Sequence, residues 1–227
     1  MADNVAVADK GMSAPAQVIA AVVLVGGLAA GAWAMQAADR QEAEGPARCS
    51  VSTDVLPAQY ASGARLCEAL NRPDLPVLLG TPQDPVRSAS GSGDWQTFGS
   101  GTKRAAPQAT AETEKHHVEI GVDYDLRVES AGLLGSDVQK QTVLGRPAVF
   151  YSSQTLAIGF NIGGSGKATS GRGPMARSLA VARDAKDGGG FYEVTVWRRS
   201  GSLMPDDTTL LAVAEKVLPT LPGWQNG

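Results

Sequence analysis

The chain has 227 residues, of which 43% are hydrophobic and 19% are charged. This composition is typical of a folded protein with one well-packed domain, and it excludes a largely disordered chain. The net charge of −3 gives no electrostatic reason to expect a nucleic-acid partner, because proteins that bind nucleic acids present basic surfaces.

An apolar run follows a short polar N-terminal tail, residues 1–13. No charged side chain occurs in residues 14–38, and every residue from Val18 to Met35 is apolar. A helix rises about 1.5 Å per residue, so this run is long enough to span nearly all of a bilayer core of about 30 Å. We therefore expect residues 14–38 to be a transmembrane helix or uncleaved signal anchor behind a short cytoplasmic tail. The alternative is a cleaved signal peptide, because Ala32-Trp33-Ala34 fits the small-x-small pattern of a cleavage site.

Gly27 and Gly31 form a G-x-x-x-G pattern within the apolar run. Two small residues one helical turn apart let the backbones of two membrane helices approach closely. Such matches also arise by chance in a segment rich in Ala and Gly. The pattern therefore predicts a weak homodimer through the membrane helix at most.

Cys49 and Cys67 are the only cysteines, and both follow the apolar run. Paired cysteines persist in oxidising compartments, and a bridge that closes a loop of this length would stabilise the fold by about 3 kcal/mol. We expect a disulfide between them, which places the C-terminal part on the extracytoplasmic side of the cell membrane. Two unrelated buried thiols are the alternative.

The remaining segments alternate between helical and extended patterns. Residues 39–58 are polar and contain prolines, as a linker does, and we expect a globular domain over residues 59–225. A first helix has its apolar face at Ala64, Leu66, Cys67 and Leu70, and Pro73 ends it. Short apolar runs then predict strands over residues 95–98, 116–126, 142–152, 155–163, 178–185 and 191–199, with turns at 152–154 and 186–190. A last helix, residues 206–221, places Leu210, Val213, Ala214, Val217 and Leu218 on one face.

This order of elements predicts an α+β fold. We expect an antiparallel sheet of five or six strands, with the N-terminal and C-terminal helices packed on one face, preceded by one transmembrane helix. The clearest strand has Val118, Ile120 and Val122 on one side and Glu119 and Asp123 on the other. Its period of two indicates one dry and one solvated side.

No motif for a known chemistry is complete. The loop at 161–173 resembles a phosphate-binding loop, but Asn161 and Ala168 stand where the motif needs Gly and Ser or Thr. His117 could share a metal ion with Glu119 on one strand face, yet the chain has only two histidines, so a solvated face is the better interpretation. There is no G-x-S-x-G elbow. We therefore predict no catalytic residue, no metal site and no cofactor.

Four stretches carry a resemblance to a known family: "LCEALNRPDLPVLLGTP" (66–82), "TVLGRPAVFYS" (142–152), "VARDAKDGGGFYEVTVWR" (181–198) and "LLAVAEKVLPTLPGW" (210–224). With them the chain resembles an uncharacterised actinobacterial, streptomycete family of single-pass membrane-anchored proteins, a domain of unknown function. The resemblance implies an anchored extracytoplasmic domain and assigns no activity.

These patterns favour a non-catalytic binding or interaction module at the cell envelope, whose partner is an unknown envelope protein or ligand. The alternative is a small hydrolase or ligand-sensing domain whose site is not visible in the sequence. A pocket with convergent titratable groups would favour the alternative. An exposed apolar patch would favour an interaction module.

Overall fold

The computed structural model describes residues 47–51, 56–97, 101–160, 168–199 and 203–224. The predicted cytoplasmic tail, the predicted membrane helix and its Gly27 and Gly31 lie outside these ranges. Within them, no helix is both long and apolar enough to cross a membrane.

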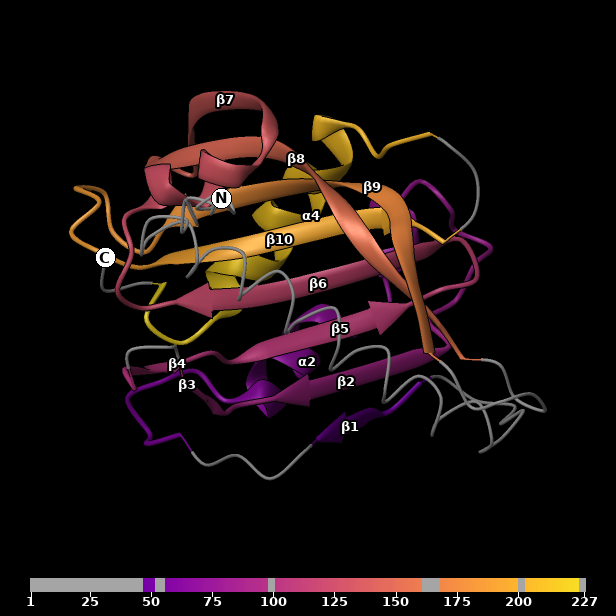
Figure 1. Ribbon diagram of the computed structural model, residues 1–227, viewed down its shortest axis with the longest axis horizontal. Coiled ribbons are helices and arrows are strands. Elements are labelled where there is room, and N and C mark those ends of the chain that lie inside the picture. The colour runs from indigo at the N-terminus through magenta and orange to yellow at the C-terminus, as the bar shows by residue number, and fades with distance from the viewer. Residues whose placement is uncertain (1–46, 52–55, 98–100, 161–167, 200–202, 225–227) are drawn as a thin grey trace, which may run out of the picture.

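A twisted sheet of eight strands forms the centre of the fold (Figure 1). The strands lie in the order β1-β2-β5-β6-β10-β9-β8-β7. Strand β1 runs parallel to β2, and all other neighbours are antiparallel. Strands β3 and β4 form a separate two-stranded sheet. The bounds are β1 Cys49–Val51, β2 Ser88–Ser92, β3 Trp95–Thr97, β4 Lys103–Ala105, β5 Gln108–Glu112, β6 His116–Asp123, β7 Ser136–Val143, β8 Arg146–Phe160, β9 Ala168–Ala182 and β10 Phe191–Arg198.

The predicted α+β class, with five or six antiparallel strands, is wrong. The fold is mostly β, with an eight-stranded mixed sheet and a small second sheet. The sequence did not predict strands β2 and β5, because they consist largely of small residues and lack the Val, Ile and aromatic side chains that are typical of strands. A close helix requires those small residues: a Cβ added to Gly91 of β2 would lie 2.0 Å from the carbonyl oxygen of Gly63.

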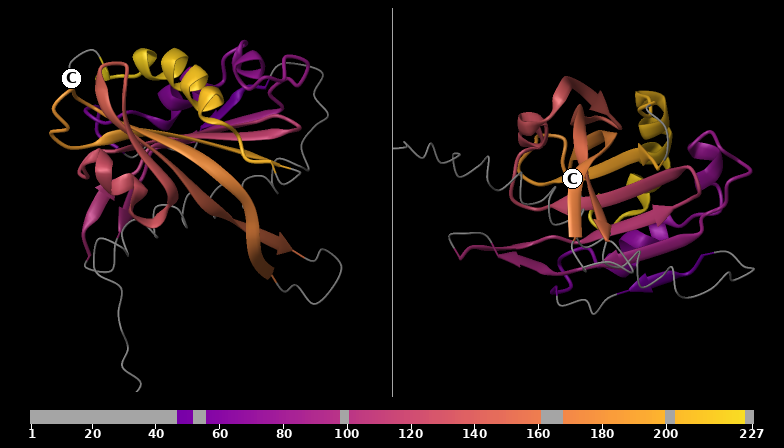
Figure 2. Two further views of the ribbon diagram at one scale, coloured as in Figure 1. Left: turned by 90° about the horizontal axis from the view of Figure 1, so that it is seen from above. Right: turned by 45° about the vertical axis from the view of Figure 1, so that its right-hand side comes forward.

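Two long strands replace the shorter ones that the sequence predicted. Strand β8 runs through Ser152, where a turn was expected, and β9 begins at Ala168, within the expected loop. The turn lies instead at Leu144 and Gly145, both with positive φ, as a tight hairpin requires. The pairing of β8 with β9 shifts register between Gln154 and Leu156. Beyond that irregularity the two strands swing away from the sheet (Figure 2).

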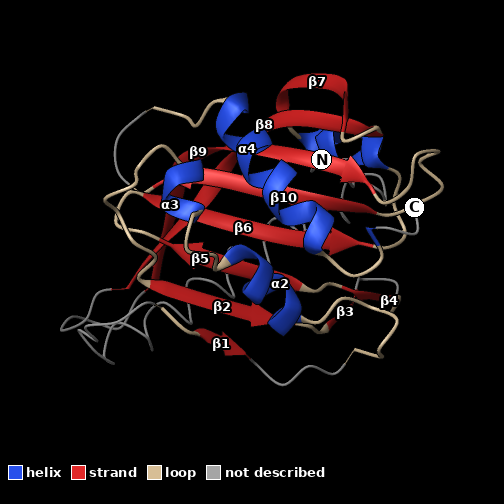
Figure 3. Ribbon diagram, turned by 180° about the vertical axis from the view of Figure 1, so that it is seen from behind, coloured by secondary structure: helices blue, strands red, loops and turns tan. Residues whose placement is uncertain are grey.

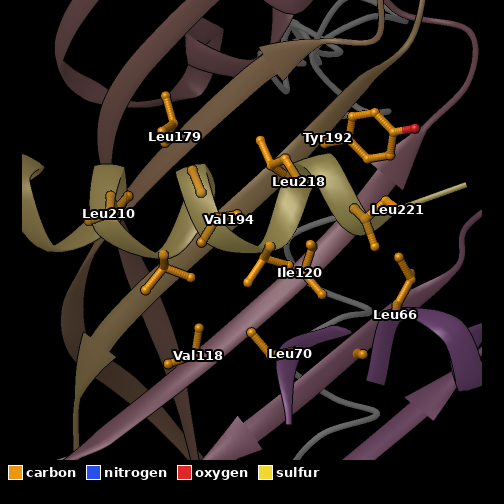
Figure 4. Close-up of a cluster of buried hydrophobic side chains, with 14 of the residues drawn as sticks. Leu66, Leu70, Val118, Ile120, Leu179, Tyr192, Val194, Leu210, Leu218 and Leu221 are labelled. Atoms are coloured by element: carbon orange, nitrogen blue, oxygen red, sulfur yellow. The ribbon is translucent and has the colours of Figure 1, made fainter. Parts of the chain in front are cut away.

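Three helices lie on one face of the sheet (Figure 3). They are α2 (Gly63–Leu70), α3 (Leu75–Leu78) and α4 (Asp207–Val217). Ser62 and Asp206 accept hydrogen bonds from backbone N–H groups in the first turns of α2 and α4. The face between helices and sheet is the main core (Figure 4), which includes Leu66, Leu70, Val118, Ile120, Leu179, Val194, Leu210 and Leu218.

The expected disulfide joins Cys49 of β1 to Cys67 of α2, with Cα atoms 6.0 Å apart. Because β1 has only three residues and forms the edge of the sheet, this covalent link fixes the edge strand to the helix that covers the sheet. The bridge has a structural role at this position.

The opposite face of the sheet, here called the open face, has no α-helix over it among the described residues. It carries the side chains of Glu119, Glu193 and Thr195, with Gly121 between them. The short 3-10 helix η1 (Val128–Leu134), the β3–β4 hairpin and the bent ends of β8 and β9 all project on this side (Figure 2).

Candidate functional site

A cleft of about 300 Å³ lies on the open face. Strand alternation creates it, because every second residue of β6 and β10 points into the core and the residues between them point into the cleft. In β6 these are His117, Glu119, Gly121 and Asp123, and in β10 they are Phe191, Glu193, Thr195 and Trp197. The side of β6 that the sequence indicated as solvated is therefore the floor of a cleft.

Two carboxyl groups lie near the middle of the floor. Glu119 pairs with Thr195 across β6 and β10, and Glu193 lies two residues from Thr195 on the same face, which makes the two glutamates diagonal neighbours. Burial, with repulsion from Glu193, raises the pKa of Glu119 to about 7. Burial also raises the pKa of Glu193. Near pH 7 Glu119 is therefore partly protonated, whereas an ordinary glutamate would be fully ionised.

Tyr151 of β8 orients one member of the pair. Its hydroxyl donates a hydrogen bond to Oε1 of Glu193. Burial and the neighbouring Glu193 raise the pKa of Tyr151 well above its usual value, so the phenol stays protonated. The hydroxyl hydrogen of Tyr151 is donated to Glu193. Glu119 has no such donor, because it makes no hydrogen bond or ion pair with any residue that the structure describes.

A histidine–carboxylate pair lies at one end of the cleft. Nδ1 of His117 is 3.0 Å from Oε1 of Glu112, and the imidazole stacks on the Trp197 ring with centroids 3.8 Å apart. The hydrogen bond to His117, followed by the charges of His117 and Arg199, lowers the pKa of Glu112. An ionised carboxylate only accepts, so the hydrogen lies on Nδ1, and Nε2 of a neutral ring is an acceptor. His117 is 5% exposed, and its Nε2 has no hydrogen-bond partner in the described part of the chain.

The other end of the cleft is built from the loop after β6. The Asp123 carboxylate accepts hydrogen bonds from the backbone N–H groups of Asp125 and Leu126, at 2.8 Å and 2.7 Å. Arg104 of β4 lies 3.7 Å from Asp125. Leu126 and Phe191 supply an apolar wall there. Asp123 thus orders the loop that carries this wall.

Gly121 leaves the centre of the floor without a side chain. A Cβ built at this position would meet nothing closer than the carbonyl oxygen of Pro107, at 3.9 Å. The space above Gly121 is therefore open, and a larger side chain here would enter the cleft without disturbing the strand.

The profile of a family of unknown function (DUF6215) matches residues 9–137, more than half of the chain. The chain belongs to this family. The match includes strands β1 to β6, with Glu112, His117 and Glu119, and ends inside β7, before Tyr151 and Glu193. Neither the curated proteins nor the solved structures contain a match to the chain. The expected resemblance to a domain of unknown function is thus shown, and DUF6215 membership carries no activity with it.

The site of this DUF6215 protein differs from what the sequence indicated. Cys49 and Cys67 lie at the sheet edge, away from the cleft. His116 and His117 are neighbours on one strand and point to opposite faces, so they cannot share a ligand. Among the described residues, no three His, Cys, Asp or Glu side chains are placed to hold a metal ion.

Sequence reasoning missed the acidic pair and the aromatic residues beside it. The one available signal was a glutamate within each of two strands, Glu119 and Glu193, where apolar and β-branched residues prevail. Each can be explained as a solvated position, and only the register of β6 against β10 shows that they share one floor.

Proposed function

We propose that this DUF6215 protein is a binding module of the cell envelope, and that it holds a small molecule in the cleft of the open face. The observation that carries this proposal is the cleft itself. Its volume of about 300 Å³ is that of a small ligand site. Apolar side chains such as Trp197, Phe191 and Leu126 form its walls, while a few polar groups converge at its floor, as is typical of sites that bind small molecules.

Binding is favoured over chemical conversion because most polar groups of the floor have fixed partners. Tyr151 donates to Glu193, His117 is hydrogen-bonded to Glu112, and Asp123 accepts from two backbone N–H groups. These contacts keep the groups in place, and the one phenol beside a carboxyl, Tyr151, stays protonated because burial raises its pKa. A rigid arrangement of this kind lowers the entropic cost of binding a ligand.

The position in the envelope rests on the N-terminal part of the chain. Residues 14–38 would anchor the protein in the cell membrane, residues 39–58 would be the linker, and residues 59–225 would form the extracytoplasmic domain. The Cys49–Cys67 disulfide supports an oxidising compartment. Gly27 and Gly31 would allow a weak homodimer of the membrane helices.

The binding proposal is tested by blocking the cleft. Gly121→Leu fills the open space above the floor, and Gly171→Leu is the matched control, because a Cβ at Gly171 meets nothing within 4 Å and this residue lies outside the cleft. A library of water-soluble fluorinated fragments is screened by fluorine NMR against the full chain. We expect fragments that bind the wild-type protein and the Gly171 variant, and whose binding Gly121→Leu removes. If no fragment distinguishes the two variants, the cleft is not a ligand site.

One observation favours a hydrolase as a second candidate. Glu119, with its pKa raised to about 7, lies beside Glu193, and two neighbouring carboxyl groups, of which one keeps a proton near neutral pH, can serve as general acid and general base for hydrolysis. Panels of 4-nitrophenyl esters and glycosides test this. Release of 4-nitrophenol that Glu119→Gln abolishes would support a hydrolase, and the absence of turnover on both panels would count against it.

A further inference from the structure

We propose that the ligand of this cleft is an organic cation, an amine or guanidinium on an apolar body, whose charged group lies against Glu119 and Glu193. This inference rests on the proposed binding function and specifies the class of ligand. It follows from the charges that line the cleft, from the surplus of hydrogen-bond acceptors, and from the aromatic walls.

The charges in the cleft are predominantly negative. Four acidic side chains and one arginine line it, namely Glu112, Glu119, Asp123, Glu193 and Arg104. Arg104 lies near Asp125, and Glu112 forms an ion pair with Arg199 and a hydrogen bond with His117. Asp123 accepts hydrogen bonds from two backbone N–H groups, whereas no lysine, arginine or histidine forms an ion pair with Glu119 or Glu193 in the described part of the chain. A cation placed there would replace the mutual repulsion of the two carboxylates with attraction.

Acceptor atoms in the middle of the cleft lack donors among the described residues. Nε2 of His117 is buried without a partner, and it is an acceptor in the neutral imidazole whose Nδ1 donates to Glu112. The Glu119 carboxyl adds two acceptor oxygens, while the Tyr151 hydrogen is already donated to Glu193. A buried acceptor without a donor costs free energy. An ammonium or guanidinium brings several N–H donors and no acceptor, so it complements this floor better than a neutral or anionic group would.

The walls suit an apolar body attached to the charged group. Trp197 is held flat by its stack on His117, and Phe191 and Leu126 lie at the far end of the floor. Aromatic faces attract cations as well as apolar groups. The gap above Gly121 gives such a body room between these walls.

Binding of this cation should release a proton. In the empty cleft Glu119 has a pKa of about 7, and a bound cation favours its ionised form. The titratable and charged groups that face it are Glu112 from β5, His117 and Asp123 from β6, Arg104 from β4, Tyr151 from β8 and Glu193 from β10. If binding requires ionised Glu119, affinity should rise by about tenfold from pH 6 to pH 8.

Three probes of matched shape test the inference on the full chain, kept in solution by a neutral detergent. They are phenethylammonium, the neutral 2-phenylethanol and the anionic 3-phenylpropanoate, titrated by calorimetry at pH 6 and pH 8. We expect phenethylammonium to bind at least about tenfold more tightly than the alcohol, as a charge-assisted contact implies, and the anion to bind most weakly. Affinity for the cation should rise with pH, and affinity for the alcohol should not.

Glu119→Gln should reduce the affinity for phenethylammonium by about tenfold or more and remove its pH dependence. Glu215→Gln, an exposed glutamate on α4, is the control and should change neither. Thermal unfolding by circular dichroism checks that both variants are folded. Equal binding of the three probes, tighter binding of the anion, no binding of the cation, or an unchanged affinity in folded Glu119→Gln would overturn the inference. If the fragments that Gly121→Leu displaces are neutral or anionic, the binding function stands and the cationic ligand class is wrong.

Discussion

Replacing Glu119 by glutamine should stabilise the protein at alkaline pH. The carboxyl keeps its proton in the folded protein up to a pKa of about 7, against 4.5 for an unperturbed glutamate. Below pH 4.5 the group is protonated in the folded and unfolded states, so its contribution to stability is fully present. Between these values the unfolded chain loses the proton more readily, and stability falls as pH rises through 7. Glutamine cannot ionise and escapes this loss.

The magnitude follows from the pKa difference. A difference of about 2.5 units corresponds to about 3 kcal/mol, at about 1.36 kcal/mol per unit. Glu119 is half-buried and reaches solvent through the cleft. Water therefore screens part of the electrostatic free energy, and about 2 kcal/mol is the expected effect on stability. The advantage of Glu119→Gln over the wild-type protein should therefore grow by about 2 kcal/mol between pH 5 and pH 8.

Urea denaturation, followed by tryptophan fluorescence with the disulfide intact, measures the free energy of unfolding of both proteins at each pH. Urea is preferred because guanidinium is itself a cation of the proposed ligand class. Glu215→Gln should show no such pH-dependent advantage. If the difference between Glu119→Gln and the wild-type protein stays constant from pH 5 to pH 8, Glu119 is not the buried, proton-retaining group that the cleft requires.

Three further predictions concern the disulfide, the packing of α4 and the side of the membrane on which the domain lies. Cys49→Ala should lower the free energy of unfolding by about 3 kcal/mol, since the bridge spans 18 positions. Thiol alkylation of the unreduced wild-type protein should label neither cysteine, and labelling of both would show that no bridge forms. Val217→Asp should cost several kcal/mol and leave the domain insoluble, because Val217 at the end of α4 is fully buried in the core. Lys216→Gln on the exposed side should be tolerated, and equal solubility of the two variants would mean that α4 does not pack on the sheet. Protease added to intact cells should remove the region after residue 38, and resistance in intact cells but not in lysed cells would place it inside.

Parts of the fold could be predicted because their signals are local. The stripe Leu210, Val213 and Val217 fits one helical face over about two turns, and Asp206 caps the start of the helix. The alternation in β6 needs only its own residues. The disulfide could be predicted because the chain offers one possible pair of cysteines.

The extra strands could not be predicted because tertiary contacts decide them. Ser152 looks like a turn residue, yet it is buried in β8, where its hydroxyl accepts a hydrogen bond from Arg177 at 3.0 Å. Arg177 in turn pairs with Asp207 at the start of α4, at 2.6 Å. Such a network joins three distant segments. No local sequence pattern predicts this network.

The candidate site depends even more on register. Glu119 and Glu193 lie far apart in the sequence, and each alone fits a solvated strand position. They share a floor because β6 pairs with β10 so that Glu119 faces Thr195. A slip of one residue would turn one of them into the core. The helix face was therefore predictable from the local spacing of its apolar residues, and the cleft face was not.

The most direct test of the cleft as the functional site is to map a bound fragment by amide NMR of the full chain. With the tightest-binding fragment of the library, shifts should concentrate at Gly121, Thr195 and the Trp197 indole, and Leu70 and Val217 on the helix side should stay unchanged. Shifts at the helices, or shifts that persist in Gly121→Leu, would contradict a ligand site on the open face.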